Sequence, residues 1–370
     1  MGMLRLGPLE LNNRFALAPL AGVSDWPFRL LCREQGASMV CTEMVSSHGL
    51  VHGGDQTLTY IERPPDERPF QVQIFGQDIP VLAEAARILV EHYGPIDLID
   101  INFGCPVKKV CSTGAGAAYL KEPARLEAAV RAVAEATPVP VTVKLRAGWD
   151  DSTRNVVDCA KAAEQGGALK IGVHPRTRAQ LYNGKSDWTL IARVKAAVGI
   201  QVWGSGDLFT AHDAMRMLAA TGADGARIAR GACGYPWIFR ELIALERGDP
   251  LPAPPDVAEW RAAIERHLDL AVANHSGRYK LAGVVPTRHR PPREVRDPEE
   301  SAIRELRKHL LWYTRHRRGG LAFRRVADQL RTVASVREAL DRFFPLDGSV
   351  PIEVRGEPEP ISADVAESTA

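Results

Sequence analysis

The sequence has no long apolar run and no closely spaced pair of cysteines, and both absences restrict what the protein can be. No stretch approaches the ~18 apolar residues that a membrane-spanning helix requires. The six cysteines include no C-x-x-C pair, which argues against a zinc site, an iron–sulfur cluster or a disulfide scaffold. The amino terminus lacks the basic and apolar regions of a secretory signal. We therefore expect a soluble, cytoplasmic protein with no metal site and no membrane contact.

A strong overall charge is also missing, but the charge is unevenly distributed along the chain. The formal net charge is only +2 over 370 residues. Between residues 274 and 325, however, there are fourteen Lys and Arg against five Asp and Glu, interleaved with Tyr279, Trp312 and Tyr313. A solvated helical face is the ordinary explanation of such a run. An excess this dense beside aromatic residues favours a nucleic-acid partner.

Most of the chain alternates between strand-like apolar runs and segments with helical periodicity. A short hairpin is expected at residues 4–11, around a Gly-Pro turn. After it, we predict strands at 15–20, 39–43, 70–75, 96–103, 139–145, 168–174, 200–203 and 225–229. Helices are expected at about 26–35, 80–92, 123–136, 155–165, 188–197, 210–220 and 236–246.

Eight β/α units in about 230 residues predict an α/β fold of the TIM (β/α)8 barrel type, because parallel neighbours require helical crossovers. A doubly wound open sheet is the alternative. No G-x-G-x-x-G motif follows the first predicted strand, so the dinucleotide-binding form of that fold is disfavoured.

The composition changes after the predicted barrel domain, which we place at residues 1–249. The Pro-rich segment 250–255 predicts a stiff linker. A small all-α domain follows at 256–345, with helical periodicity over 257–274, 299–315 and part of 323–344. Residues 346–370 are acidic and rich in Pro, Glu and Ser, which is typical of a disordered tail.

In a TIM barrel the chemistry lies at the carboxyl ends of the strands. Polar residues follow or end six of the predicted strands, and these are Glu43, Gln73, Asn102, Lys144, His174 and Asp207. One such residue would mean little, but six at equivalent ends predict a shared pocket.

Cys105 lies in the turn Gly104-Cys105-Pro106, directly after the strand that contains Asn102. Loops that a rigid strand positions are where catalytic side chains concentrate. The ordinary alternative is a small buried cysteine that acts only as a hydrophobic residue. The local sequence leaves both interpretations open.

The loops after the seventh and eighth predicted strands indicate a phosphate site. They contain Gly204-Ser-Gly-Asp207 and Ala229-Arg-Gly231, whose small residues let backbone N–H groups approach an anion. Arg230 can add a bidentate contact. Alone, a G-x-G sequence is common in loops, but at this position in a barrel it favours a phosphorylated cofactor.

Three other strand-end residues suit a heterocyclic cofactor. Lys144 can hold the anionic edge of a ring, although a snorkelling lysine is the alternative. Gln73 carries both an amide donor and an acceptor for a ring edge. His174 can donate to a phosphate or a ring, and a structural histidine with satisfied hydrogen bonds is its competitor.

Together these motifs resemble the tRNA-dihydrouridine synthase family, in particular its bacterial B-type branch. The resemblance extends from about residue 5 to residue 345, and the Gly-Cys-Pro turn combined with His174-Pro-Arg-Thr-Arg178 makes it specific. The other matching segments are 18–22, 25–28, 72–74, 100–106, 143–146, 182–184, 206–207, 230–231, 236–239, 307–309 and 312–313.

The resemblance implies that uridine in tRNA is reduced to 5,6-dihydrouridine by tightly bound FMN, which NADPH recharges. Hydride would pass from flavin N5 to C6 of uracil, and Cys105 would protonate C5 as the general acid. Asn102 would orient the uracil, and Arg176 and Arg178 would contact tRNA. The protein is expected to be monomeric.

The resemblance also assigns residues to the cofactor. Those expected to contact the flavin are Pro19, Leu20, Ala21, Gln73, Lys144 and His174. Those expected to bind its ribityl phosphate are Ser205, Gly206, Asp207, Ala229 and Arg230. The basic helical domain would supply contacts to the tRNA phosphates.

The sequence departs from the family pattern at several positions. Ser205 stands where Asn is usual and Ala229 where Gly is usual; both are small, so we expect FMN binding to survive with altered loop contacts. Lys170 lies in the sixth predicted strand, where an uncharged residue is expected. The Pro- and Arg-rich segment 284–298 looks longer than usual and is a candidate tRNA-contacting loop.

Two other functions fit parts of the sequence. A small-molecule flavoenzyme of the dihydroorotate or dihydropyrimidine dehydrogenase kind would share the barrel and the phosphate site, but it would not need a basic appended domain. A non-catalytic RNA-binding protein on a decayed barrel is disfavoured because Cys105, Lys144 and Gln73 are all present.

Overall fold

A β-hairpin begins the fold and covers one end of a barrel. In the computed structural model, which describes residues 4–64, 67–276 and 297–346, strands β1 (Leu4–Leu6) and β2 (Leu9–Leu11) pair antiparallel. Leu6 and Leu11 are buried in an apolar cluster with the barrel residues Met39 and Trp203. The predicted hairpin is therefore present and packs under the barrel.

Eight parallel strands form the barrel, in the spatial order β3-β10-β9-β8-β7-β6-β5-β4. A parallel bridge between Ala16 and Met39 joins the two ends of this order, so the sheet closes on itself. The strands are β3 (Phe15–Leu17), β4 (Val40–Ser46), β5 (Phe70–Phe75), β6 (Leu98–Phe103), β7 (Val141–Arg146), β8 (Lys170–His174), β9 (Gln201–Gly204) and β10 (Gly225–Ile228). The predicted TIM barrel is confirmed.

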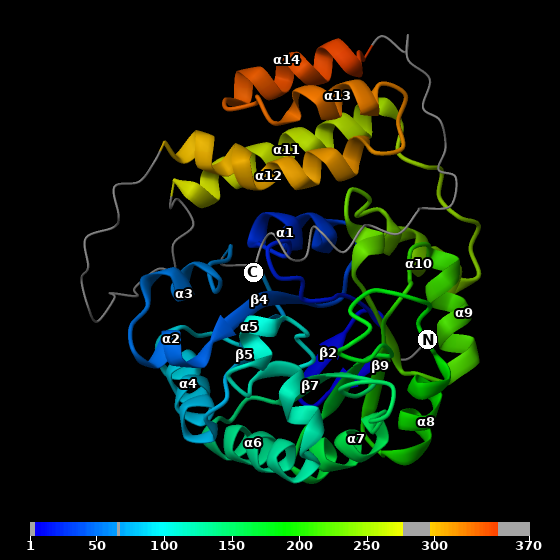
Figure 1. The fold of residues 1–370 in the computed structure, drawn as a ribbon. Coiled ribbons are helices and arrows are strands. Elements are labelled where there is room, and N and C mark those ends of the chain that lie inside the picture. Colours follow the sequence, from blue (N-terminus) through cyan, green and yellow to red (C-terminus); the bar gives the residue numbers. More distant parts are fainter. Residues whose placement is uncertain (1–3, 65–66, 277–296, 347–370) are drawn as a thin grey trace.

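Helices surround the strands on the outside of the barrel (Figure 1). They bury apolar stripes against the sheet and begin at capping residues such as Asp78 and Thr210, whose side chains accept backbone N–H groups. The long ones are α1 (Trp26–Glu34), α4 (Ile79–His92), α6 (Pro123–Ala136), α7 (Val156–Gln165), α8 (Thr189–Ala197), α9 (Ala211–Thr221) and α10 (Ile238–Arg247). Two short helices between β4 and β5 were not predicted, α2 (Ser47–Val51) and α3 (Asp55–Thr59).

Four further helices form a layer at one end of the barrel, above α1 in Figure 1. They are α11 (Val257–His275), α12 (Pro298–Thr314), α13 (Gly320–Ala327) and α14 (Val333–Phe343), and they share an apolar core of their own. Helix α11 packs on α1, where the Trp26 indole N–H donates to the Asn274 side chain at 2.5 Å. Arg266 pairs with Glu34 across the same contact.

The inside of the barrel carries charged side chains as well as apolar ones. Arg227 is buried there, and it fits because Gly172 lies opposite: a Cβ at position 172 would lie 2.6 Å from the Arg227 guanidinium. Lys170 is also buried, with Nζ 3.9 Å from Met39 Sδ and 4.9 Å from the centre of the Trp203 ring. Burial, together with the nearby Arg227 charge, lowers the pKa of Lys170 well below its usual value, which favours the neutral amine.

Two predictions fall largely on residues outside the described part of the chain, the tRNA-contacting loop at 284–298 and the tail at 346–370. Within the described ranges, no helix combines the length and the apolar character needed to cross a membrane.

Candidate active site

The strand ends bring four of the predicted residues side by side. Gln73, Asn102, Lys144 and His174 lie on the adjacent strands β5, β6, β7 and β8, and Asn102 is directly beside Lys144 in the strand register. Successive residues of a strand point to opposite faces, so positions 71 and 73, 100 and 102, and 142 and 144 share the inside of the barrel. The interior is therefore lined by polar groups from the middle of the barrel up to its carboxyl end.

Cys105 is held in a tight turn at the end of β6. The Asn102 Oδ1 atom accepts hydrogen bonds from the backbone N–H of Gly104 at 2.9 Å and of Cys105 at 2.8 Å. The Cys105 carbonyl accepts from the Ala117 N–H at 3.1 Å, which ties the following loop back over the turn. The Cys105 side chain is buried, with 7% of the residue exposed. Burial raises the pKa of its thiol, so the sulfur carries a proton at neutral pH.

Gln73 connects Asn102 to a buried carboxylate. Its Oε1 atom accepts from Asn102 Nδ2 at 2.8 Å, and its Nε2 atom donates to Asp100 Oδ2 at 2.6 Å. The oxygen of Asn102 is committed to the Cys105 turn. Its amide keeps one N–H, and so does that of Gln73, so both can act toward a bound molecule as donors.

Lys144 and Arg146 supply the positive charge of the site. Lys144 forms no hydrogen bond or ion pair with any described residue, and burial, together with Arg146 and Arg227, lowers its pKa to about 8. Arg146 donates to the Gly104 carbonyl at 2.8 Å and to the Leu181 carbonyl at 2.8 Å, so it clamps the Cys105 turn from the side of β7. Sequence reasoning gave Arg146 no role, although it is the next inward-facing position after Lys144.

The predicted tRNA-contacting arginines have different surroundings. Arg176 is 2% exposed, and its guanidinium forms two hydrogen bonds to Asp207, at 2.8 and 2.9 Å, and one to the Gly184 carbonyl at 2.6 Å. It holds Asp207 in place from inside the protein. Arg178 is half-buried with its guanidinium 4.7 Å from the centre of the Trp149 ring.

The loops predicted to bind phosphate carry unused backbone donors. Among the described residues, the N–H groups of Gly206, Asp207 and Arg230 have no acceptor. The Ser205 hydroxyl instead donates to the Val173 carbonyl at 3.0 Å. The Asp207 carboxylate is matched by two guanidinium groups, since Arg230 also contacts it at 3.1 Å. The geometry thus offers an anion several donors and no uncompensated negative charge.

The remaining predicted residues border this cluster. His174 is buried, and burial lowers its pKa well below the usual value, so the ring is neutral and lies 3.5 Å from Arg176 Nη1. Pro19 and Leu20 are half-buried and Ala21 is exposed, on the loop that follows β3. Glu43 was predicted at a strand end but lies in the middle of β4, which continues to Ser46. It accepts from the Gly22 N–H of the loop after β3, and burial raises the pKa of its carboxyl to about 7.

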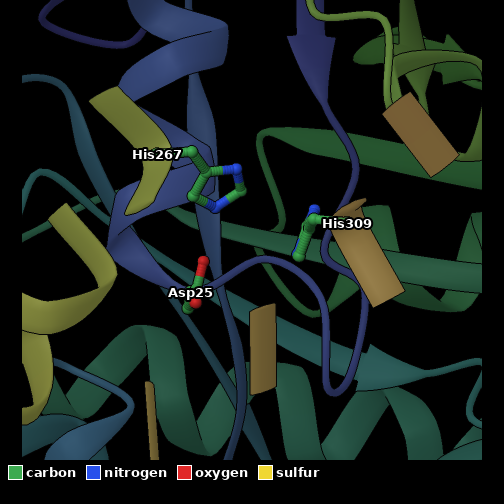
Figure 2. A group of neighbouring side chains, drawn as sticks. All are labelled: Asp25, His267 and His309. Carbon is green, nitrogen blue, oxygen red and sulfur yellow. The ribbon is translucent and has the colours of Figure 1, made fainter. Parts of the chain in front are cut away.

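A second polar cluster lies between the barrel and the helical layer, and sequence reasoning missed it. Figure 2 shows Asp25, at the start of α1, facing His267 of α11 and His309 of α12. One side-chain atom from each lies within 4.8 Å of the others, but no two of them form a hydrogen bond or ion pair. Tetrahedral zinc would bring its ligand atoms to about 3.4 Å from one another, so this spacing is loose for a metal site. Both imidazoles are buried, and burial lowers their pKa values, that of His267 to about 3.

A closed (β/α)8 barrel that carries a buried thiol, a buried lysine and unused backbone N–H groups toward its carboxyl end has the architecture of a TIM-barrel enzyme. The family model described as "Dihydrouridine synthase (Dus)" matches residues 16–346. The chain belongs to this family, as its motifs predicted.

Named relatives align along nearly the whole chain. The chain is 40% identical to tRNA-dihydrouridine synthase B of Pseudomonas aeruginosa over 345 residues, which are 93% of this chain and 96% of that protein. It is 40% identical over 361 residues to a probable tRNA-dihydrouridine synthase of Mycobacterium tuberculosis, covering 94% of this chain and 86% of that one. The tRNA-dihydrouridine synthase B of Salmonella typhimurium is 36% identical, with 92% and 99% covered.

Solved structures with the same fold are distant in sequence. Histamine dehydrogenase from Rhizobium sp. 4-9 aligns with a TM-score of 0.50 and 13% identity, covering 66% of this chain and 47% of that one. A complex of 2-naphthoyl-CoA reductase aligns with a TM-score of 0.51 and 11% identity, covering 67% and 52%. At these identities the likeness shows the barrel fold alone.

Proposed function

We propose that the protein reduces specific uridines of tRNA to 5,6-dihydrouridine, with FMN as a tightly bound cofactor and NADPH as the reductant. The observation that carries the proposal is the Cys105 turn: a protonated thiol fixed at a strand end of a dihydrouridine synthase barrel. FMN, once reduced, would supply the hydride that saturates the uracil ring at C6. The chain must then bind the cofactor, hold the base and deliver one proton.

The donor set of the site fits FMN. The unused N–H groups of residues 206, 207 and 230 and the Arg230 guanidinium suit a phosphate, with Ser205 and Ala229 as small neighbours that leave room. Lys144, which has no partner among the described residues, suits an anionic ring edge. The remaining N–H of Gln73, the neutral His174 ring and the loop Pro19–Ala21 would border the flavin.

Cys105 is proposed as the acid that protonates C5 of the uracil. A buried thiol with a raised pKa stays protonated at neutral pH, so it is ready to donate rather than to attack as a nucleophile. The remaining Asn102 N–H would hold a uracil carbonyl. The target base must leave its stack to reach this depth, which is least costly in a loop of the tRNA.

The helical region, which we assign to a domain at residues 256–345, is proposed to bind tRNA. Exposed cations without an ion-pair partner among the described residues lie on α12, α13 and the turn between them, and these are Arg304, Arg315, Arg318, Arg324 and Arg325. They would contact phosphates and give binding a steep salt dependence. Arg178 is the barrel residue proposed to reach tRNA, and Arg176 is proposed to position Asp207. We further propose a monomeric enzyme of the cytoplasm, where tRNA is found.

One experiment separates this function from a small-molecule pyrimidine dehydrogenase. The purified protein is incubated with NADPH and tRNA that lacks dihydrouridine, and in parallel with dihydroorotate and an electron acceptor. We expect a flavin absorbance near 450 nm and dihydrouridine in the tRNA, with no oxidation of dihydroorotate. Turnover of dihydroorotate without any change in tRNA would overturn the proposal.

A further inference from the structure

Asp100 is a fully buried charge in the middle of the barrel, and no step proposed above uses it. It is 0% exposed and lies on β6, two residues before Asn102. Its carboxylate accepts hydrogen bonds from Gln73 on one side and from the Thr142 hydroxyl on the other. The Arg227 guanidinium is 3.7 Å away, close enough to compensate its negative charge. Burying a carboxylate is costly, so its presence calls for a reason.

The carboxylate dictates which way each amide above it points. An ionised carboxylate can only accept, so Gln73 must turn its N–H group toward Asp100 and its oxygen toward Asn102. Asn102 must then donate its N–H to Gln73, which turns its own oxygen toward the Cys105 turn. That oxygen accepts both backbone N–H groups of the turn, at 2.9 and 2.8 Å. The Asp100 carboxylate, the two amides and the backbone of the turn therefore form one series of hydrogen bonds, in which every donor points toward Asp100.

A second series of hydrogen bonds reaches Asp100 through Thr142, on the side away from Gln73, and holds the carboxylate in place. The Arg227 guanidinium donates to Gln71 Oε1 at 3.1 Å, and Gln71 Nε2 donates to the Thr142 hydroxyl oxygen at 2.8 Å. The Thr142 hydroxyl hydrogen is left to donate to Asp100. Donors thus converge on Asp100 from both sides, and it is the one acceptor-only group of the network.

We propose that Asp100 is a positioning residue, which fixes the orientation of the Gln73 and Asn102 amides and through them the backbone that carries the Cys105 thiol. The inference rests on the proposed function, since it gives Cys105 its catalytic meaning. It differs from a simple packing role: a residue of the same shape at position 100 fills the same space but does not fix the direction of the series. Asparagine is such a residue, because it can present either its oxygen or its N–H group to Gln73.

The first test measures the reactivity of Cys105 in the Asp100→Asn variant. Purified full-length protein is treated with iodoacetamide, and the modified fraction of each cysteine-containing peptide is followed by mass spectrometry. Without a fixed acceptor, the turn loses its hydrogen bonds part of the time, and we expect Cys105 to be alkylated roughly tenfold faster than in the wild type. Cys233, which is buried but outside the network, should keep its rate. An equal rise at both cysteines would mean general loosening and would overturn the inference.

Thr142→Val is the matched control. Thr142 is as buried as Asp100 and hydrogen-bonds to it from the other side, but its loss leaves the carboxylate facing Gln73. The Cys105 alkylation rate should stay within about twofold of the wild type, because hydrogen bonds of the second series contribute to stability without setting the first one. A rise equal to that of Asp100→Asn would show that any damage near position 100 frees the thiol.

The decisive variant moves the carboxylate from position 100 to position 73, the next residue in the series of hydrogen bonds. In Asp100→Asn combined with Gln73→Glu, the carboxylate introduced at position 73 must accept from both neighbours, so Asn102 still turns its oxygen to the Cys105 turn. We expect the double variant to fold and to recover a Cys105 alkylation rate within about twofold of the wild type, the signature of coupled neighbours. A double variant that stays fast or does not fold overturns the inference. If the wild type fails to reduce tRNA, the proposed function is wrong, but the alkylation rates still decide the role of Asp100.

Discussion

His267 lies between the barrel and the helical layer, and its burial makes a quantitative prediction about stability and pH. The ring is 0% exposed, its Nδ1 atom is 3.3 Å from the Tyr313 hydroxyl, and its Nε2 atom has no partner among the described residues. Burial, assisted by the nearby Lys308 charge, lowers its pKa from 6.5 to about 3. Folding therefore favours the neutral ring.

The direction of the pH effect follows from the difference in proton binding between the unfolded and the folded chain. Between pH 3 and pH 6.5 the unfolded chain holds a proton on His267 that the folded chain does not, so the free energy of unfolding falls as the pH falls in this range. Well above pH 6.5 the ring is neutral in both states, so this group no longer lowers the free energy of unfolding. From pH 7.5 to pH 5.0 the loss attributable to this one group is about 2 kcal/mol.

Neighbouring groups also titrate, so a variant must isolate the His267 contribution. Burial lowers the pKa of His309 as well, which acts in the same direction, whereas burial raises the pKa of Asp25 and opposes it. In His267→Asn an amide replaces the ring near Nδ1, close to Tyr313, and does not titrate. At pH 7.5 the variant should be less stable than the wild type because it leaves a cavity.

Urea unfolding at pH 7.5 and pH 5.0, followed by tryptophan fluorescence and by circular dichroism, provides the measurement. We expect the drop in unfolding free energy between the two pH values to be smaller in His267→Asn than in the wild type by about 2 kcal/mol. If both proteins lose the same amount, His267 is not buried in its neutral form and the described packing of α11 on α1 is wrong.

Three other predictions concern the cofactor, the barrel interior and tRNA. Lys144→Met should reduce the flavin content of the purified protein, and wild-type affinity for FMN should weaken between pH 7 and pH 9 as Lys144 loses its proton near pH 8, a loss that the variant should not show in absorbance titrations. Gly172→Ala should destabilise the protein by about 1–3 kcal/mol in urea, because the new methyl group meets the Arg227 guanidinium; unchanged stability would mean that the guanidinium lies elsewhere. Arg324→Gln should weaken tRNA binding and lower the slope of log K against log salt by about 1, whereas an unchanged slope in filter binding would remove α13 from the interface.

The barrel was predictable because its signals are local. The alternation of apolar β-branched runs with helical stripes locates every strand of the barrel and the helices that flank most of them. The short helices α2 and α3 escaped prediction because five residues are too few to show a period. Periodicity predicts which face of a helix or strand is buried, but it does not predict the secondary structure of a short connection.

The site was predictable only as a set of positions at strand ends. The direction and the partners of a side chain depend on neighbours that are distant in sequence. Arg176, for example, was predicted to contact tRNA, and nothing in the local sequence indicates that its guanidinium pairs with Asp207, 31 residues later. The Arg227 guanidinium fits inside the barrel only because residue 172, on another strand, is a glycine and leaves room for it. The cluster of Asp25, His267 and His309 joins three separate helices and carries no local signal.

The central claim is that Cys105 donates the proton that completes reduction of a tRNA uridine, and single-turnover reduction tests it most directly. Wild-type protein and Cys105→Ala, both reduced with NADPH and matched for flavin content, are mixed with tRNA that lacks dihydrouridine, and the dihydrouridine formed is measured by mass spectrometry. We predict that the variant forms it roughly 10²- to 10⁴-fold more slowly while binding tRNA as tightly as the wild type. A variant that reduces tRNA at the wild-type rate would contradict the account.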